Sequence, residues 1–592
     1  LTEELGHHLD NVVNEENTSG DEGAIFSNLA LGNELSNEEL EYLRAKNDSG
    51  LITVDGKEIA VEQSEEFTRI RPTNPERTRG EIRNRYSFAA LKENGSVVTW
   101  GSSGSGGDSS DVEGELTGGV TDIFSNAVAF AALKENGSVV TWGSSGSGGD
   151  SSDVEGELTG GVTDIFSTNE AFAALKENGS VVVWGNEEMR SGLNFGGDSS
   201  DVEGELTGGV TNIFSTWYAF ATLKEDGSVV TWGGYGGDSS DVEDELTGGV
   251  TDIFSNRFAF AALKENGSVV TWGTPGGVNG GDSSEVKEEL SSGVTYIFST
   301  GGAFAALKED SSVVTWGDEE WGGDSSEVED ELTGGVTDIF STGTAFAALK
   351  EDSSVITWGS QEWGNWDNPR GDISEVEDEL SGGVTDIFSS NFAFAALKED
   401  GSVVTWGLEN GGGDSSEVED ELTGGVTDIF STRQAFAALK EDGSVVTWGF
   451  SGGDSSDVED ELSSGGVTDI FSTESAFAAL KENGSVITWG DEDRGGDSSA
   501  VEDELSEGVV TLASPFVKTG DAFIPPDVPE IISRTPFTFS LDEVSVGDTL
   551  FTVEANPGDS DPDDLQFSFT EDIPEFEIDP NSGEVSVEQE IE

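Results

Sequence analysis

The side chains that most often perform chemistry in proteins are unevenly distributed in this chain. Cysteine is absent, and the only histidines are His7 and His8. Glu4 and His7 have the spacing of the second half of a His-Glu-x-x-His zinc motif, but Glu3 occupies the place of the first histidine. An amphipathic helix that buries its leucines is the alternative interpretation, and it is the one that the incomplete motif favours.

Charge limits the possible partners. The 592 residues include 120 Asp and Glu against 27 Lys and Arg, a formal net charge of −93. Such a field repels nucleic acids and anionic lipid surfaces. No apolar run is long enough to span a membrane. Without Cys or a nucleophile–base pair, catalysis would need paired carboxylates alone. We therefore expect no nucleic-acid binding, no membrane insertion and no enzymatic activity.

A repeat organises most of the chain. The dipeptide Trp-Gly recurs ten times, and residues 88–125 are identical to residues 130–167. The tryptophans of these dipeptides are Trp100, Trp142, Trp184, Trp232, Trp272, Trp316, Trp358, Trp406, Trp448 and Trp489. A period of this kind is typical of propellers and other repeat architectures.

Each repeat predicts three strands. The segments Val-Thr-Asp-Ile-Phe-Ser, Ala-Phe-Ala-Ala-Leu-Lys-Glu and Ser-Val-Val-Thr-Trp-Gly are rich in strand-forming residues. The last two are joined by Asn-Gly or Asp-Gly, a strong hairpin signal. At 308–313 and 350–355 a serine replaces this glycine, which predicts slight strain. Phe130 and Ala132 fall on one strand face and Ala131 and Leu133 on the other, so both faces should be covered.

An acidic segment precedes these strands. In residues 109–116, Ser110 and Glu113 have a capping-box spacing, and Val112 and Leu116 can face inward from one helical turn. We expect a solvated acidic cap rather than a metal site.

The repeat pattern resembles the regulator of chromosome condensation repeat, and its short spacing is closest to the β-lactamase inhibitor protein II branch. The resemblance implies a β-propeller, although propellers of this family usually have fewer blades. A larger ring, repeats outside the ring and an open spiral all stay possible. The expected fold is all-β: a propeller-like array of about ten short three-stranded blades, each with a helical turn. A small N-terminal α+β segment and a partial C-terminal β-sandwich flank this array.

Composition divides the chain into five parts. An N-terminal α+β segment occupies 1–66, with a hairpin predicted around Asp55-Gly56. An Arg-rich linker follows at 67–81, the repeat array at 82–515, a Pro-rich linker at 516–536 and a partial module at 537–592. Six arginines crowd the entry to the array, and we expect them to pair with carboxylates: Arg69, Arg71, Arg77, Arg79, Arg83 and Arg85.

Variation between repeats is confined to two loops. One precedes the Ala-Phe strand and the other follows Trp-Gly, so strand order places both at the same end of every blade. Trp, Tyr and Arg, the residue types that dominate binding hot spots, gather in these loops. The predicted partner-binding residues are Arg190, Trp217, Tyr218, Tyr235, Arg257, Phe258, Trp321, Trp363, Trp366, Arg370, Phe392, Arg433 and Arg494.

Residues 537–587 resemble a cadherin-like repeat through an Asp-Glu start, an Asp-x-Asp-x-Asp cluster and a later Ser-Gly-Glu-Val segment. The resemblance implies a calcium-binding module, with candidate ligands Glu543, Asp559, Asp561 and Asp563. The family's Asp-Arg-Glu segment is missing.

These features predict a secreted or cell-surface binding or adhesion protein. The partner would be a protein or a glycan at the variable loops, and calcium would bind the C-terminal module. The alternative is a propeller-type inhibitor of a secreted enzyme. The chain resembles a fragment of a large bacterial surface protein.

Overall fold

The computed structural model describes residues 84–186, 194–274, 278–359, 373–374 and 376–513, together with the backbone of several short strands outside this range. The chain divides into two compact units. One comprises Asn74–Val517, and the other comprises Leu1–Thr73 and Lys518–Glu592.

The second unit is described only through its strands. β1 (Ser49–Val54) pairs antiparallel with β2 (Lys57–Glu62), and Val54 lies opposite Lys57, which confirms the predicted hairpin. β34 (Thr549–Thr552), β37 (Glu584–Val587) and β36 (Phe576–Ile578) form one sheet, and β33 (Glu530–Ile531) pairs with β35 (Ala555–Asn556). The two histidines and the expected calcium ligands Glu543, Asp559, Asp561 and Asp563 lie outside the described residues.

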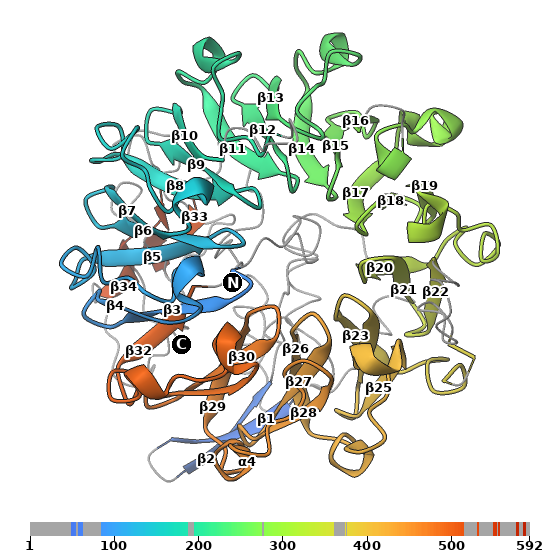
Figure 1. Ribbon diagram of the computed structural model, residues 1–592. Helices are drawn as coiled ribbons and strands as arrows, with labels where there is room; N and C mark the ends of the chain where they lie inside the picture. The colour runs from blue at the N-terminus through green and yellow to red at the C-terminus, as the bar shows by residue number, and fades with distance from the viewer. Residues whose placement is uncertain are drawn as a thin grey trace. The chain divides into compact units, whose positions relative to one another are not determined.

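The first unit contains ten three-stranded antiparallel sheets in its described residues, so the all-β blade architecture is confirmed (Figure 1). The Val-Thr-x-Ile-Phe-Ser segments form the strands nearest the axis, which are β5 (Val120–Ser125), β8 (Val162–Ser167), β11 (Val210–Ser215), β14 (Val250–Ser255), β17 (Val294–Ser299), β20 (Val336–Ser341), β23 (Val384–Ser389), β26 (Val426–Ser431) and β29 (Val467–Ser472). The Ala-Phe segments form the middle strands, which are β3 (Ser87–Lys92), β6 (Ala129–Lys134), β9 (Ala171–Lys176), β12 (Ala219–Lys224), β15 (Ala259–Lys264), β18 (Ala303–Lys308), β21 (Ala345–Lys350), β24 (Ala393–Lys398), β27 (Ala435–Lys440) and β30 (Ala476–Lys481). The Trp-Gly segments form the outer strands, which are β4 (Val97–Gly101), β7 (Val139–Gly143), β10 (Val181–Gly185), β13 (Val229–Gly233), β16 (Val269–Gly273), β19 (Val313–Gly317), β22 (Val355–Gly359), β25 (Val403–Gly407), β28 (Val445–Gly449) and β31 (Val486–Gly490).

The ring is closed by strands from its two ends. β32 (Val509–Leu512), which follows the tenth repeat, pairs with β3 at the start of the array, and Ala90 lies opposite Leu512. The first blade is therefore β32-β3-β4, and the remaining blades follow in chain order to blade ten, β29-β30-β31. Closure leaves no blade at an exposed end, so neither an open spiral nor repeats outside the ring describes this chain.

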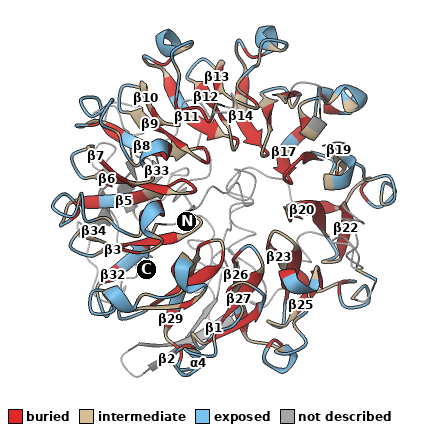
Figure 2. Ribbon diagram, viewed as in Figure 1, coloured by how far each residue is buried: buried red, intermediate tan, exposed pale blue. Residues whose placement is uncertain are grey.

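The hydrophobic core lies between neighbouring blades. Ten buried clusters each combine the Ala-rich face of one blade with the Phe and Trp of the next, and one of them joins blade ten to blade one. Burial follows the middle strands around the ring (Figure 2). The expectation that both faces of these strands are covered is thus confirmed.

Nine of the ten Trp-Gly tryptophans also donate a hydrogen bond to a glycine carbonyl of the loop before their blade in the described residues, Trp406 being the exception. The Trp142 Nε1–H donates to the Gly106 carbonyl at 3.0 Å, and its ring stacks on Phe130 with centroids 5.2 Å apart. A Cβ atom at Gly106 would lie 2.5 Å from the Phe130 ring, so this site requires glycine. The corresponding bond of Trp100, to Gly495, contributes to ring closure.

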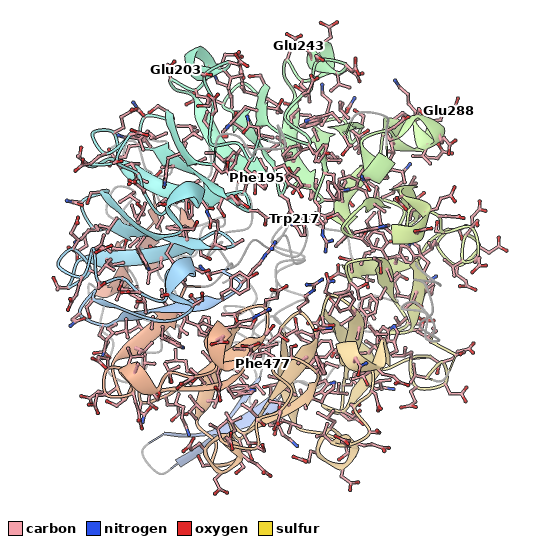
Figure 3. All side chains as sticks on the ribbon, in the orientation of Figure 1. Phe195, Glu203, Trp217, Glu243, Glu288 and Phe477 are labelled. Atoms are coloured by element: carbon pink, nitrogen blue, oxygen red, sulfur yellow. The ribbon has the colours of Figure 1, made fainter. Side chains whose placement is uncertain are left out.

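The acidic segments form short turns on the outer rim. Figure 3 shows Glu203, Glu243 and Glu288 there, far from the axis. Leu116 is buried as predicted, but the capping box is wrong, because the Ser110 N–H donates to the Asp108 carboxylate at 3.0 Å. That bond lowers the pKa of Asp108. Only one of these turns is an α-helix in the described residues, α4 (Glu459–Ser463).

Other acidic segments contain turns or 3-10 helices, and further 3-10 helices lie in the loops that follow Trp-Gly. All the 3-10 helices in the described residues are three residues long. They are η3 (Ser103–Ser105), η4 (Ser145–Ser147), η5 (Glu203–Glu205), η6 (Glu243–Glu245), η7 (Val278–Gly280), η8 (Ser284–Val286), η9 (Glu289–Ser291), η10 (Glu319–Trp321), η11 (Glu409–Gly411), η12 (Glu419–Glu421), η13 (Glu492–Arg494) and η14 (Ser499–Val501). None of the helices in the described part of the chain is long and apolar enough to cross a bilayer.

Candidate binding face at the loop end of the ring

Both variable loops meet at one end of each blade, as predicted. In blade four the Gly234 N–H, just after the outer strand, donates to the Tyr218 carbonyl, just before the middle strand, at 2.8 Å. Blades three and eight make the equivalent bond, from Asn186 to Glu170 and from Leu408 to Phe392. We call this end of the ring the loop face. The opposite end, which carries the Asn-Gly and Asp-Gly turns, is the hairpin face.

The first residue of each variable tripeptide has a structural role. The Thr216 hydroxyl donates to the Tyr235 carbonyl at 3.0 Å and accepts the Ala219 N–H at 3.0 Å. Asn256 does the same through its amide, bonding the Asn279 carbonyl and the Ala259 N–H. Because both side chains are buried, this position ties the two loops together rather than contacting a partner.

The second residue of each tripeptide lies on a hydrogen-bonded belt around the axis. In the described residues, nine of the ten belt N–H groups donate to the carbonyl of the belt residue in the next blade, at 3.0–3.3 Å. The belt comprises Arg85, Ala127, Asn169, Trp217, Arg257, Gly301, Gly343, Asn391, Arg433 and Glu474. The final bond, from Glu474 to Arg85, closes the belt between blades ten and one. Ten residues of differing type, two of them glycine, are thereby held on a hydrogen-bonded ring of backbone.

Several belt side chains form a bridge across the mouth of the ring. Trp217 of blade four lies between two guanidinium groups, at 4.3 Å from Arg257 and 5.6 Å from Arg85 of blade one. Arg257 also lies 5.3 Å from the Trp321 ring. Its Nη2 donates to Asn391 Oδ1 of blade eight at 3.2 Å. We call these five residues the axial bridge. Cation–π contacts of this kind each contribute about 0.5–2 kcal/mol.

Two glycines make room for the bridge. Trp321 comes from the outer loop of blade six, and its ring lies over Gly301 and Gly302 of that blade. A Cβ atom at Gly301 would clash with the Trp321 ring and approach Arg257 Nε to 2.9 Å, and one at Gly343 would approach Asn391 Oδ1 to 2.7 Å. Because the belt glycines have no side chain, neighbouring side chains occupy the space beside them.

An aromatic cluster lies beside the bridge on blades three to five. Tyr218 packs against Phe195, Tyr235 and Phe258, with ring centroids 5.1, 5.3 and 6.0 Å away. Phe195 is buried, whereas the other three rings are only partly buried. Burial raises the pKa of the Tyr218 hydroxyl above its usual value. Figure 3 places Phe195 and Trp217 near the centre of the ring.

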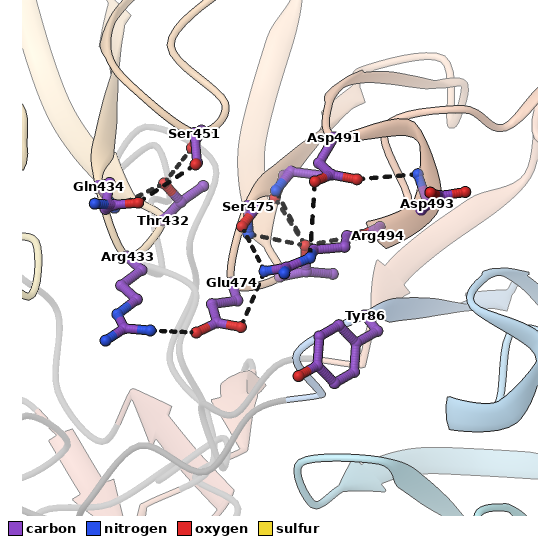
Figure 4. Close-up of polar contacts among 12 residues, drawn as sticks. Tyr86, Thr432, Arg433, Gln434, Ser451, Glu474, Ser475, Asp491, Asp493 and Arg494 are labelled. Carbon is purple, nitrogen blue, oxygen red and sulfur yellow. Dashed lines mark hydrogen bonds and ion pairs between the residues drawn. The ribbon is translucent and has the colours of Figure 1, made fainter. Parts of the chain in front are cut away.

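An arginine cluster lies on the opposite sector, across blades nine, ten and one (Figure 4). The Glu474 carboxylate accepts Arg433 Nη1 at 2.8 Å and Arg494 Nη1 at 3.2 Å. Arg494 also lies 3.7 Å from Asp491 and stacks over the Tyr86 ring. Arg85 follows Glu474 on the belt and donates to Asn169 Oδ1. We define the arginine cluster as Arg433 and Arg494 around Glu474.

The predicted partner-binding residues are thus brought together in part. Trp217, Arg257 and Trp321 belong to the axial bridge, Tyr218, Tyr235 and Phe258 to the aromatic cluster, and Arg433 and Arg494 to the arginine cluster. Phe392 lies under Arg433, 5.4 Å from its guanidinium. Arg190, Trp363, Trp366 and Arg370 lie outside the described residues.

Sequence reasoning missed several residues of this face. Phe195 completes the aromatic cluster and Glu474 the arginine cluster, and Phe450 is 67% exposed in the outer loop of blade nine. Each of these positions differs from its counterparts in other repeats, and that difference was the available signal. In the described residues the Arg85 side chain contacts Asn169 and Trp217. The expected pairing of the six entry arginines with carboxylates stays a prediction, because the other five lie outside the described residues.

No group of three or more His, Cys, Asp or Glu side chains is arranged to hold a metal ion in the part of the chain that the structure describes. The prediction that the protein is not an enzyme is untested by this observation and stays a prediction.

Comparisons with known proteins give only matches to solved structures at low identity. No family model and no curated protein matches the chain. Among solved structures, it is similar to the CRINKLY WD40 ectodomain of the Arabidopsis thaliana receptor kinase ACR4, at 16% identity over 47% of this chain and 93% of that one, with a TM-score of 0.26.

The chain is also similar to yeast RCC1 (Prp20) in complex with Kap60, at 15% identity over 57% of this chain and 81% of that one, with a TM-score of 0.27. Prp20p from Saccharomyces cerevisiae, described with its binding to Gsp1p and histones, matches at 15% identity over 64% and 84% of the two chains, with a TM-score of 0.27. Values this low carry no argument about function, which rests on the loop face itself.

Proposed function

We propose that this protein is a binding protein that grips a protein partner with the loop face of its ring. The observation that carries the proposal is a contiguous, partly exposed surface of Trp, Tyr, Phe and Arg side chains on the belt and its flanking loops. These residue types dominate binding hot spots because they offer large contact areas and several polar groups at little entropic cost.

Rigidity supports the same conclusion. The belt bonds and the stacked Trp217, Arg257 and Trp321 side chains fix the surface before any partner arrives. A preordered surface loses less conformational entropy on binding than flexible loops do. The repeats provide the scaffold, and the positions that depart from them provide the contacts.

A protein partner fits this surface better than a glycan does. The aromatic cluster spans three blades, and the arginine cluster lies across the axis from it, so the contacts are spread over the whole mouth of the ring. A wide surface with several separate anchors matches a protein interface, which typically involves about 20–30 residues on each side. Glycan binding is therefore an outcome of the test rather than the proposal.

The test uses the full chain and matched variants on the two faces. Candidate partners are captured from a displayed library of secreted and surface proteins, and binding is measured by surface plasmon resonance. We expect a partner whose affinity falls at least tenfold for Tyr218→Ala or Trp217→Ala, as for typical hot-spot residues, and is unchanged for Asn178→Asp on the hairpin face. Circular dichroism melting confirms that each variant is folded.

Equal effects of loop-face and hairpin-face variants would contradict the proposal, as would binding to a glycan array alone. A captured hydrolase that loses activity on binding would favour the alternative of a propeller-type inhibitor. Secretion or surface location, adhesion and a calcium site at residues 543–563 stay predictions. Calcium titration of the full chain by isothermal calorimetry tests the last of these.

A further inference from the structure

Five of the ten turns at the hairpin face contain the tripeptide Asn-Gly-Ser. They belong to blades one, two, three, five and ten, and their asparagines are Asn94, Asn136, Asn178, Asn266 and Asn483. The pattern Asn-x-Ser, with any middle residue except proline, is the acceptor motif for asparagine-linked glycosylation. Within the residues that the structure describes, the motif occurs at these turns and nowhere else.

Each turn uses the oxygen of the asparagine side chain and not its nitrogen. In blade one, Asn94 Oδ1 accepts the backbone N–H of Ser96 at 3.0 Å and its hydroxyl at 2.7 Å. A backbone N–H can only donate, so this bond identifies the amide atom that faces Ser96 as the oxygen. The same two bonds recur in the other four Asn-Gly-Ser turns.

The amide nitrogen of these asparagines is accessible. All five asparagines are exposed, and in none of them does Nδ2 donate a hydrogen bond to another described residue. Nδ2 is the atom to which an asparagine-linked glycan is attached. Its modification would therefore break no hydrogen bond that the described residues make.

The remaining five blades show what the fold requires at this position. They have Asp226, Asp310, Asp352, Asp400 or Asp442 there, and Oδ1 of each accepts the same two groups of the serine two residues later. Asparagine and aspartate thus complete the turn with identical bonds. The amide nitrogen is an additional group that half of the blades have and that the turn does not use.

The motif is unevenly distributed around the ring. Blades ten, one, two and three are consecutive in the closed ring and all contain it, as does blade five, whereas blade four and blades six to nine have aspartate. The hairpin face lies at the opposite end of every blade from the loop face. Glycans at these turns would therefore cover one arc of the hairpin face and leave the candidate binding surface open.

We propose that the five Asn-Gly-Ser turns of the hairpin face are acceptor sites for asparagine-linked glycans. The donor is an oligosaccharide linked to a lipid through a pyrophosphate. Nδ2 forms a bond to the anomeric carbon of the sugar, the bond from that carbon to the pyrophosphate oxygen breaks, and the amide gives up one proton to a base of the transferase. The lipid pyrophosphate leaves with the bonding electron pair. The proposal rests on the predicted secretion or surface location and is independent of the proposed binding function.

The test maps glycans on the full chain, secreted from a eukaryotic cell line behind a secretion signal. Tryptic glycopeptides are identified by mass spectrometry with their glycans attached. Cleavage after Lys92 and Lys134 separates the two identical repeats, because the resulting peptides contain different variable tripeptides, at 126–128 and 168–170. We expect glycans on the peptides that contain the five asparagines and none on the peptides that contain the five aspartates.

Asn17 and Asn47, which lie outside the described residues, also occur in the pattern Asn-x-Ser. A glycan on either one shows that the chain has met the transferase. Five unmodified hairpin-face asparagines in such molecules would overturn the proposal, and a secreted chain without any glycan would overturn it as well.

Matched variants test whether the turn itself directs the modification. Asn136→Asp keeps the bonds of the turn but removes Nδ2, and Ser138→Ala keeps Nδ2 but removes the hydroxyl of the motif, so each should abolish the glycan of blade two alone. Asp226→Asn creates Asn-Gly-Ser in blade four and should add one glycan. Circular dichroism melting confirms that each variant is folded. A glycan that persists in Ser138→Ala, or its absence from blade four of Asp226→Asn, would contradict the proposal.

Discussion

The hairpin face and the loop face differ in how much their side chains vary from one repeat to the next. At the hairpin face, eight of the ten repeats have the same glycine-containing turn, and all ten have the same lysine with a bond to a backbone carbonyl. At the loop face, the backbone is equally regular along the belt, but the side chains differ from blade to blade and contact each other across the mouth. The side chains that are the same in every repeat therefore stabilise the scaffold. The side chains that differ between repeats lie on an equally regular backbone and form the candidate binding surface.

The largest expected effect comes from breaking the scaffold. Trp142→Ala removes the stack with Phe130 and the bond to Gly106, so it should cost about 3–5 kcal/mol of folding free energy, as is typical for a buried Trp. Trp142→Phe keeps most of the packing and should cost less. Urea denaturation followed by circular dichroism measures both. A cost for Trp142→Ala below 1 kcal/mol would mean that the uniform residues are not the scaffold.

A loop-face substitution should separate binding from stability. Arg257→Gln removes the cation between Trp217 and Trp321 and should cost only about 1–2 kcal/mol of folding free energy. Partner affinity should fall by a larger factor, because the two tryptophans lose their common contact. Melting curves measure the loss of stability, and surface plasmon resonance on the same preparation measures the loss of partner affinity. A variant that loses stability and affinity in equal measure would contradict the separation of the two faces.

The belt glycines offer a more local test. The Gly301→Ala substitution should displace the Trp321 ring, because the new Cβ would overlap the indole. We expect a shift in tryptophan fluorescence and about 1–3 kcal/mol of destabilisation from overpacking. Gly204→Ala, at a position with open space around its Cβ, is the matched control and should change neither. An unchanged spectrum for Gly301→Ala would show that the bridge does not depend on this gap.

Two blades have serine where the hairpin-face turn of the other blades has glycine, and restoring glycine there should stabilise the ring. Ser311 and Ser353 occupy turn positions with φ values of 60° and 62°, where the other blades have glycine. The predicted strain is therefore confirmed. Ser311→Gly and Ser353→Gly should each raise stability by about 1 kcal/mol or less, because the left-handed conformation disfavours a side chain. Glycine in place of Ser138, which lies outside this turn position, should not help.

The acidic turns should give the smallest effect. The N–H and hydroxyl of Ser326 and Ser416 hold the pKa values of Asp324 and Asp414 below their usual range. A lowered folded-state pKa contributes stability above the unfolded value, near 3.9, and that stability is lost as pH falls through the folded value. The melting temperature below about pH 4 should therefore drop less in Asp324→Asn and Asp414→Asn, relative to neutral pH, than in the wild type. An identical drop would exclude these caps as a source of acid sensitivity.

Much of the blade could be predicted because its signals are local. Strand alternation, Asn-Gly and Asp-Gly turns and the Trp-Gly period specify three strands and their order without reference to the rest of the chain. The shared end of the two variable loops follows from that order. The capping box failed because an aspartate two residues earlier captured the same backbone N–H, a competition between two local caps that spacing alone does not resolve.

The loop face itself was predictable only as a set of residue types. The sequence indicated that Trp217, Arg257 and Trp321 belong to one end of the ring, since each departs from the repeat. It could not show that Arg85 reaches Trp217 or that Arg257 reaches Asn391, because those contacts join blades that are distant in sequence.

The amino-acid sequence by itself determined the repeating blade, its hairpins and the end at which variable residues gather, because these depend on interactions between near neighbours in the chain. Only the tertiary structure decided that ten blades close into one ring and that the divergent side chains become two clusters joined by a bridge. Closure requires β32 to pair with β3, more than 400 residues earlier in the chain. Once closed, the belt brings ten separated residues to a single mouth, and their mutual contacts follow from that geometry.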